Sequence, residues 1–314
     1  MSFTNLDLIN AVDGFPYYQV DPDLYGASIS TYYELHVTGR AYALGYMLPS
    51  VAEVFRGVAH WDLDDEDRIL TLTGGTTAAE RSAIVATTLE ALRKTGHFKV
   101  LDKWRNELYP VYGRNKELLF DVERAASPLF GVVTYGVHLT AYVKREDGLR
   151  IWVPRRAKTK QTYGGMLDNA VAGGIATGEV AFESLVRECA EEASLPEDLV
   201  RSTAKTVGCI TYFYVRGKSA GGETGLMQPE VEYVYDLELP EDIVPKPGDD
   251  EVEEFYLWTV DEVKEHLAKG EFKPNCAAVM IDFFVRHGML TPENEKDFIE
   301  IAARLHRKFE FPTL

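Results

Sequence analysis

The chain has 314 residues, of which 46% are apolar and 26% are charged, and its formal net charge is −17. The length predicts about two domains of ~150 residues each, and the negative charge argues against nucleic acid or an anionic membrane as a surface partner. The start of the chain has no leader-like pattern and no run of ~20 apolar residues occurs, so we expect a cytoplasmic protein without a membrane span.

The first part of the chain combines strand and helix patterns. Residues 31–48 are a strand candidate, and residues 77–96 have the composition of a helix that ends at a glycine. We therefore predict a smaller N-terminal α+β domain over residues 1–125 and a second domain over residues 126–314. The segment 111–128 is the expected join.

The second part begins with an alternating strand and continues with further strands and helices. From Gly131 the odd-numbered residues 133–143 are apolar, whereas Thr134, His138 and Thr140 alternate with them. Further strands are predicted at 150–155, 207–216, 231–240 and 253–260. Helices are expected after Thr259, which has Glu262 at capping-box spacing, after Asn275 and from Thr291. These elements predict a mixed sheet flanked by helices.

An acidic helix lies in the middle of this second part. Within residues 181–193 the apolar positions fall on one arc, as in an amphipathic helix. Glu188, Glu191 and Glu192 fall on another arc, where like charges repel and only Arg187 lies near to offset them. A solvated face is one interpretation. The alternative is a set of oxygen ligands for Mg²⁺ or Mn²⁺, which would remove the repulsion.

This acidic helix and the glycines before it resemble the Nudix box, G-x5-E-x7-R-E-U-x-E-E-x-G-U with U apolar. The matching residues are Gly173, Glu179, Arg187, Glu188, Cys189, Glu191, Glu192 and Leu195. The one departure is Ser194, which stands where the pattern has glycine. That glycine ends the helix in a left-handed conformation, so the serine is expected to cost ~1 kcal/mol and to leave the chemistry intact. Ser194 also has the spacing of an N-cap for a following short helix, with Glu197 three residues on.

The resemblance implies an α/β/α sandwich that holds Mg²⁺ or Mn²⁺ against a diphosphate. It assigns the metal to Glu188, Glu191 and Glu192, and it pairs Glu179 with Arg187. The Gly173–Gly174 pair shapes the loop before the helix and lets the ligand come close to the backbone. A bound dication would neutralise the diphosphate and orient the attacking water. The candidates for the general base, of which Glu251 is preferred, are Glu230, Glu232, Glu251 and Glu253.

Two other stretches are candidates for substrate binding. Residues 150–160 gather arginines and lysines, among them Arg155 and Lys158, which either neutralise substrate phosphates or form a solvated strand end. In the first domain, Trp104 and Tyr109 stand beside charged residues. They are either core side chains or a surface for a flat ring, and we predict that the first domain forms one wall of the pocket.

Nearly the whole chain resembles a two-domain branch of the Nudix superfamily related to thiamine pyrophosphokinases. This resemblance implies hydrolysis of thiamine diphosphate, and especially of its oxidised, damaged analogues, to the monophosphate and phosphate. The alternatives are hydrolysis of ADP-ribose, a dinucleotide or coenzyme A, isomerisation of isopentenyl diphosphate, or a Nudix-fold binding module without turnover. The three retained glutamates argue against the binding module.

Overall fold

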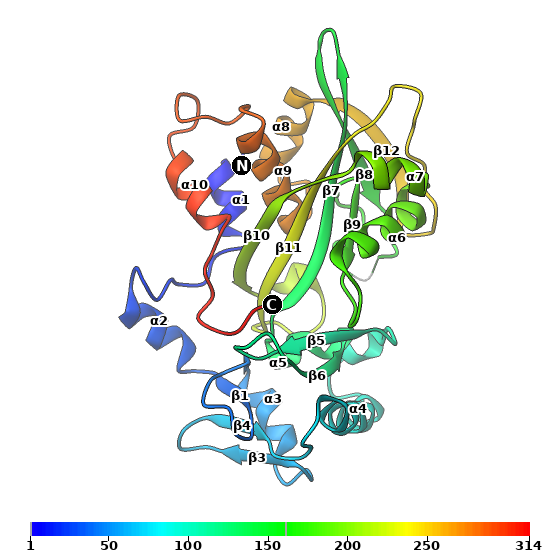
Figure 1. Cartoon of the computed structure of the whole chain (residues 1–314). Coiled ribbons are helices and arrows are strands. Elements are labelled where there is room, and N and C mark those ends of the chain that lie inside the picture. Colours follow the sequence, from blue (N-terminus) through cyan, green and yellow to red (C-terminus); the bar gives the residue numbers. More distant parts are fainter. Residues whose placement is uncertain (1, 161) are drawn as a thin grey trace.

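The structure is a computed structural model that describes residues 2–160 and 162–314. It consists of a smaller N-terminal part and a larger part built on one long sheet, with a hairpin between them (Figure 1). The predicted α/β class, with an α/β/α sandwich and a mixed sheet after an α+β domain, is confirmed.

The N-terminal part has a four-stranded mixed sheet in the order β2-β1-β4-β3. β1 pairs in parallel with β4, and the other neighbours are antiparallel. The helix predicted at 77–96 is present as α4, with Thr77 as N-cap in a capping box and Gly96 as left-handed C-cap. The elements of this part are α2 (Pro22–Ile29), β1 (Tyr33–Val37), β2 (Gly45–Met47), α3 (Pro49–Ala52), β3 (Trp61–Asp64), β4 (Ile69–Leu72) and α4 (Ala78–Thr95).

A hairpin follows where the sequence analysis placed the join. Strands β5 (Leu108–Tyr112) and β6 (Leu118–Glu123) pair antiparallel, and the short helix α5 (Ser127–Phe130) comes next. The inner side chains of the hairpin, such as Val111 and Phe120, are buried with the N-terminal core. The boundary between residues 125 and 126 stays a prediction.

The larger part is a six-stranded mixed sheet in the order β10-β11-β7-β8-β12, with β9 paired to β7. Only the β11–β7 pair is parallel among the described strand pairs of this sheet. Its strands are β7 (Thr134–Arg145), β8 (Gly148–Arg156), β9 (Val171–Gly174), β10 (Lys205–Val215), β11 (Met227–Glu238) and β12 (Val252–Thr259). Five of them overlap the predicted strands, whereas β9 was not predicted as a strand.

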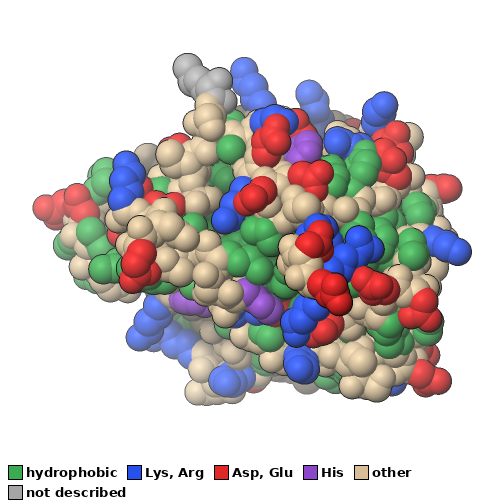
Figure 2. All heavy atoms as spheres, turned by 90° about the horizontal axis from the view of Figure 1, so that it is seen from above, with side chains coloured by type: hydrophobic (Ala, Val, Ile, Leu, Met, Phe, Trp, Pro, Cys, Tyr) green, Lys and Arg blue, Asp and Glu red, His purple; other side chains and the backbone are tan. Residues whose placement is uncertain are grey.

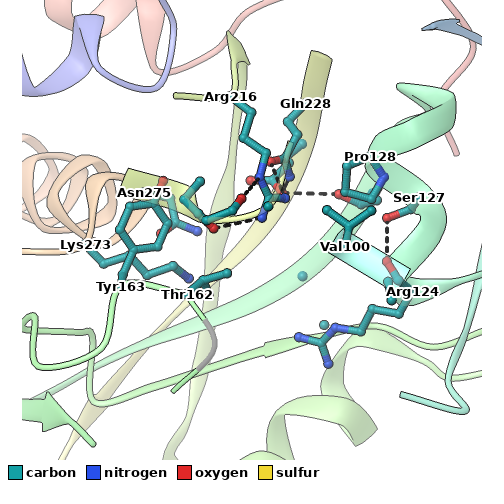
Figure 3. A pocket seen from close by; sticks show the side chains of 18 of the residues that line it. Val100, Arg124, Ser127, Pro128, Thr162, Tyr163, Arg216, Gln228, Lys273 and Asn275 are labelled. Atoms are coloured by element: carbon teal, nitrogen blue, oxygen red, sulfur yellow. Dashed lines mark hydrogen bonds between the residues drawn. The ribbon is translucent and has the colours of Figure 1, made fainter. Parts of the chain in front are cut away.

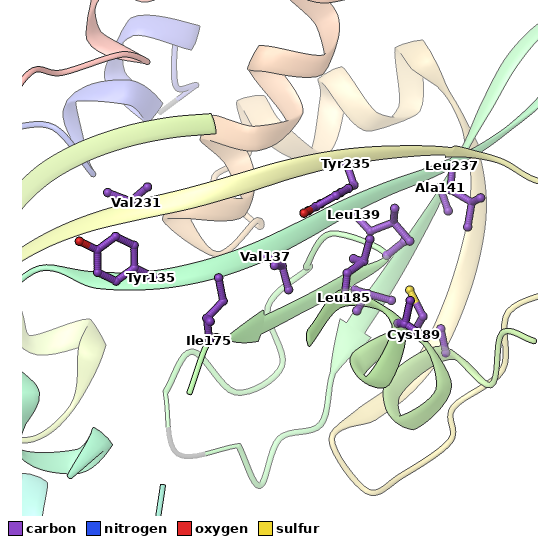
Figure 4. Close-up of a cluster of buried hydrophobic side chains, with 14 of the residues drawn as sticks. Tyr135, Val137, Leu139, Ala141, Ile175, Leu185, Cys189, Val231, Tyr235 and Leu237 are labelled. Carbon is purple, nitrogen blue, oxygen red and sulfur yellow. The ribbon is translucent and has the colours of Figure 1, made fainter. Parts of the chain in front are cut away.

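The alternating side chains of β7 pack under two helices. The predicted inner set from Val133 to Val143 lies in one core cluster with Leu185 and Cys189 of α6 (Ala181–Ala193), and α7 (Glu197–Thr203) contacts α6 (Figure 4). The predicted core face of this helix is therefore confirmed. The opposite face of β7 carries His138 toward a second layer of helices.

That second layer contains α1 (Asn5–Asn10), α8 (Val260–Ala268), α9 (Pro274–Arg286) and α10 (Phe298–Arg304). Leu8 and Ile9 of α1 share a core cluster with α9 and α10, so the first helix of the chain packs on the larger part. Thr259 and Glu262 form the predicted capping box of α8.

Three local predictions were wrong. Residues 31–48 form two strands, β1 and β2, because Gly39 turns the chain with φ +80°. The helix expected from Thr291 begins only at Phe298, after a turn in which Asn294 accepts from the backbone N–H of Thr291. Ser194 does not cap α7, whose N-cap is Pro196.

The outer surface carries many acidic side chains, as expected from the negative net charge of the chain. Seen from above, acidic side chains lie over this face, interspersed with lysine and arginine (Figure 2). In the described part of the chain no helix is long and apolar enough to cross a membrane.

Candidate active site

The glycines of β9 let the α6 glutamates pack directly against the strand. A Cβ atom on Gly173 would lie 2.2 Å from Cδ of Glu188, so no larger residue fits there without a shift. Glu188 is largely buried, and burial raises the pKa of its carboxyl despite the neighbouring guanidiniums of Arg187 and Arg124. The carboxylate is thus held between the helix and the backbone of β9.

Glu192 lies one turn further along the same inner face. It is 7% exposed, and its Oε2 accepts a 3.1 Å hydrogen bond from the backbone N–H of Ala172. Burial, together with the nearby Asp168 carboxylate, raises its pKa to about 7, although Lys160 Nζ lies 3.8 Å from its Oε1. A dication at this position would relieve the cost of keeping both inner carboxylates ionised.

Arg187 gathers the remaining glutamates of the box. It contacts Glu179 at 3.2 Å, as predicted, and it lies 3.0 Å from a carboxylate oxygen of both Glu188 and Glu191. Ser184 also donates to Glu179 at 2.7 Å, which fixes the loop before α6. Glu191 is more than half exposed, so the three glutamates that share one arc in the sequence divide into two buried side chains and one outer side chain.

Ser194 ends α6 in the left-handed conformation, with φ 51° and ψ 32°, and its side chain is exposed. The left-handed helix end predicted for this position is confirmed, whereas its cost in stability and its lack of effect on the chemistry stay predictions. The loop before β12 covers this helix end, because Lys246 and Gly248 donate backbone hydrogen bonds to the carbonyls of Ala193 and Glu192. The departure from the box therefore concerns the helix end and touches no carboxylate.

The donor chemistry of this segment fits a hard dication, since Glu188 and Glu192 are buried oxygen donors with raised pKa values. Within residues 2–160 and 162–314, no three His, Cys, Asp or Glu side chains are grouped closely enough to hold a metal ion. The predicted metal role of Glu188, Glu191 and Glu192 accordingly stays a prediction.

A cavity of about 540 Å³ opens beside β9, between the N-terminal part and the long sheet. Figure 3 shows Arg124 and Ser127 on one side of it and Tyr163, Lys273 and Asn275 on the other. The chain is acidic as a whole, yet its described lining has six lysines or arginines against three carboxylates. The cationic side chains are Lys99, Lys103, Arg105, Arg124, Arg216 and Lys273. Such a lining favours an anionic ligand.

Two carboxylates of β11 line the same cavity and are joined by Tyr212. The tyrosine hydroxyl lies 2.6 Å from Glu230 Oε2 and 2.8 Å from Glu232 Oε1. Burial raises the pKa of Glu230, whereas His138 and Tyr212 more than offset burial at Glu232 and lower its pKa. Glu232 therefore has the lower pKa of the pair and ionises more readily than Glu230.

One oxygen of Glu232 is left unpaired. Its Oε2 is buried without a hydrogen-bond partner among the described residues, and His138 Nε2 lies 3.6 Å from it. A Cβ on Gly136 would lie 2.2 Å from this oxygen and 3.0 Å from the carbonyl oxygen of Gly173. This carboxylate is thus near the box strand, and its free oxygen is available to a ligand or to water.

The predicted substrate-binding residues are divided between the cavity and other sites. Tyr109, Gly173 and Gly174 line the cavity, whereas Trp104, Arg155 and Lys158 are absent from its described lining. Trp104 instead lies under the Arg93 guanidinium at 4.9 Å. Arg155 donates to the Gly165 carbonyl and to Tyr256 on β12.

Glu251, the preferred base, is also outside the described lining. Its carboxylate is ion-paired with Lys160, which also neighbours Glu192. Of the four carboxylates considered for this role, Glu230 and Glu232 line the cavity. The sequence reasoning missed the wall residues Arg105, Arg124 and Lys273 because they come from segments distant from the box. The sequence signal available for a phosphate-binding wall was a cluster of basic residues in an acidic chain, and this signal selected residues 150–160 instead.

Comparison with known protein families supports this description. Residues 28–134 match the family model for a domain of unknown function, DUF4743, and residues 134–276 match that of the NUDIX domain. An uncharacterized protein of Saccharomyces cerevisiae, YJR142W, is 45% identical over 67% of this chain and 63% of its own. Nudix hydrolase 20, chloroplastic, of Arabidopsis thaliana is 38% identical over 73% of this chain and 59% of its own.

Among solved structures, DR0079 from Deinococcus radiodurans aligns with a TM-score of 0.38 and 19% identity, over 55% of this chain and 98% of that chain. The chain spans about three fifths of the length of the two relatives named above. The match over residues 134–276, the box residues and the sheet topology together identify the larger part of the chain as a Nudix domain.

Proposed function

We propose that this chain is a hydrolase that cleaves a diphosphate linkage of a small molecule with the help of Mg²⁺ or Mn²⁺. The observation that carries this proposal is the pair formed by the buried Glu192 and the largely buried Glu188, which are held against β9 beside a cavity with a cationic lining. Burying two carboxylates costs free energy unless their charge is balanced. A bound dication would balance this charge and would also bind a diphosphate.

The two sides of the site have different tasks in this proposal. Glu188 and Glu192 would hold the dication, and Arg187 would keep Glu179 and the preceding loop in place. A bound dication would neutralise the diphosphate and favour attack by water on phosphorus. The cationic side chains of the cavity would bind the phosphate oxygens, whose negative charge would otherwise repel the charge that develops on the attacking water oxygen.

We assign the acceptance of the water proton to Glu232. Its Oε2 has no hydrogen-bond partner among the described residues, His138 and Tyr212 lower the pKa of its carboxyl, and it lies against Gly136, which also neighbours the Gly173 carbonyl of the box strand. The water oxygen would form a bond to phosphorus, the bridging P–O bond would break, and the water proton would pass to Glu232. The released phosphate and the monophosphate ester then leave through the cavity.

For the substrate we propose thiamine diphosphate or its oxidised analogues. Thiamine carries a flat cation at one end and two phosphates at the other, and the cavity has both kinds of complement. Glu230 lies with Tyr163 and Tyr214 in its lining and would face the cation, and the six lysines and arginines of the same lining would bind the phosphates. Nudix hydrolysis of ADP-ribose, a dinucleotide or coenzyme A is the second candidate, because these diphosphates also suit the cationic lining.

A substrate panel tests the proposal. Thiamine diphosphate, oxidised thiamine diphosphate, ADP-ribose, a dinucleotide and coenzyme A are each incubated with the full chain and Mg²⁺, and the products are separated. We expect thiamine monophosphate and inorganic phosphate at the highest kcat/KM. Faster cleavage of ADP-ribose or a dinucleotide would overturn the substrate assignment, and no cleavage of any diphosphate would overturn the hydrolase.

A further inference from the structure

The hairpin β5–β6 of the N-terminal part is fixed directly to the Nudix box. The backbone N–H of Thr177 donates to the Leu108 carbonyl at 2.8 Å, and the Thr177 hydroxyl donates to Asp121 at 2.7 Å. Tyr109 packs on the glycine that follows Gly173, because a Cβ on Gly174 would lie 1.8 Å from the tyrosine hydroxyl oxygen. The hairpin therefore has a defined position relative to the α6 glutamates.

Arg124 follows β6 immediately and points its guanidinium into the cavity (Figure 3). One nitrogen is 2.8 Å from Glu107 Oε2, and the guanidinium lies 5.5 Å from the centre of the Tyr109 ring. Arg124 also acts on the box across the domain boundary, since its charge lowers the pKa of Glu188 against the effect of burial. A guanidinium of the N-terminal part is thus electrostatically coupled to a Nudix glutamate.

Arg105 brings a second guanidinium to the same cavity. Among residues 2–160 and 162–314 its side chain has no hydrogen-bond or ion-pair partner, although its backbone N–H donates to Glu123. Burial and the repulsion from Arg124 lower the pKa of Arg105. Glu107 forms its ion pair with Arg124, whereas Arg105 is exposed and is only attracted from a distance by Glu107 and Glu123, so its guanidinium stays accessible to an anion.

We propose that Arg105 and Arg124 form a phosphate-binding site, by which the N-terminal domain completes the diphosphate site of the Nudix domain. This inference rests on the proposed function. A doubly charged phosphate between the two guanidiniums removes their repulsion and accepts hydrogen bonds from both. The bound phosphate then lies next to Glu188, on the side of the cavity opposite Lys273. Two sequence segments without a Nudix motif thereby determine how the substrate is oriented.

The test separates anion binding from turnover. Inorganic pyrophosphate is titrated into the full chain without divalent metal, by calorimetry, for the wild type and for Arg105→Gln, Arg124→Gln and Arg124→Lys. The matched control is Arg93→Gln, which removes the same charge from the same domain but outside the described lining. We expect the Kd to rise about 10- to 100-fold in each Gln variant, less in Arg124→Lys, and to stay unchanged in the control.

Hydrolysis of the preferred diphosphate is then measured with Mg²⁺, and KM should rise in the same order as Kd. If pyrophosphate binding depends on Arg105 and Arg124 but no diphosphate is cleaved, the proposed function fails and the binding site stands. If diphosphates are cleaved and both Gln variants keep the wild-type Kd and KM, the binding site is wrong and the hydrolase stands. If the wild-type chain does not bind pyrophosphate at millimolar concentration, the proposed phosphate-binding site is also wrong. If Arg124→Gln does not fold, Arg105→Gln still tests the binding site, because the side chain of Arg105 makes no hydrogen bond or ion pair with the described residues that its loss would break.

Discussion

The segment proposed to bind the metal and the cavity wall are the two halves of the proposed site, and they are built in opposite ways. The first consists of β9, a loop and α6, which are consecutive in the chain, so that Gly173, Glu188 and Glu192 keep fixed spacings. The second is assembled from the hairpin and its flanks, β11 and the start of α9, so that Arg105 and Lys273, for example, are 168 residues apart in the chain. Site residues on one helix keep a fixed spacing and can be predicted from the sequence. The charged residues of the cavity wall come together only when the hairpin packs on the larger part, so they can be identified only in the structure.

The largest expected effect comes from the half proposed to bind the metal. Glu192→Gln removes a buried anionic oxygen and keeps the size of the side chain, so kcat should fall by orders of magnitude. Glu191→Gln should cost far less, because Glu191 is on the outer side of α6. Mg²⁺ binding by calorimetry and diphosphate turnover measure the two variants. Equal losses in both would show that the glutamates act as one group of ligands, as the sequence predicts.

The next effect concerns Glu232, which belongs to the cavity half. Glu232→Gln should lower kcat by about 10²–10⁴ and change KM little, because only proton acceptance is lost. Glu251→Gln is the matched comparison, since Glu251 is ion-paired with Lys160 outside the described lining. The pH profile of kcat in both variants is the decisive measurement. If kcat falls only in Glu251→Gln, the general base is Glu251, in the loop before β12, and the assignment to Glu232 is wrong.

A third prediction follows from the raised pKa of Glu188 and Glu192. Protonated carboxyls do not bind a dication, so the affinity for Mg²⁺ should fall as the pH is lowered through about 7. Without metal, the raised pKa of Glu192 makes the folded chain lose stability as the pH rises from its ordinary pKa of 4.5 toward 7. The rise in Tm on adding Mg²⁺ should therefore be larger at pH 8 than at pH 6. The reverse order would mean that these carboxylates do not hold the metal.

The contact between the two halves is tested at Gly174. Gly174→Ala places a Cβ against the Tyr109 hydroxyl, and one or the other must move, at a cost of about 1–3 kcal/mol. Tyr109→Phe in the same chain removes the oxygen and should restore part of the stability. Denaturant unfolding of the single and double variants measures this. Unchanged stability in Gly174→Ala would show that the hairpin does not depend on this contact.

The sequence predicted most of the larger domain because its elements are periodic. The alternation from Val133 to Val143 and the apolar face of α6 depend only on local spacing, and both were confirmed. The hairpin was assigned to a join, although Val111 and Phe120 pair across it, because its burial depends on packing against the core of the N-terminal part and on α4, which the local pattern does not show. The same reason explains why Arg105 and Arg124 were not singled out, while the strand-end arginine Arg155, which has a polar partner on β12, was.

The smallest expected effect is at Ser194, where the sequence departs from the box. Ser194 ends α6 with φ 51° and an exposed side chain, so Ser194→Gly should relieve the left-handed strain and stabilise the chain by at most about 1 kcal/mol. Gly96 ends α4 in the same way, with φ 65°, and Gly96→Ser is the matched reverse change, expected to destabilise by a similar amount. Thermal unfolding measures both, and turnover at saturating Mg²⁺ should be unchanged in each. A large loss of turnover in Ser194→Gly with normal stability would mean that the serine takes part in the chemistry, and that the end of the helix belongs to the site.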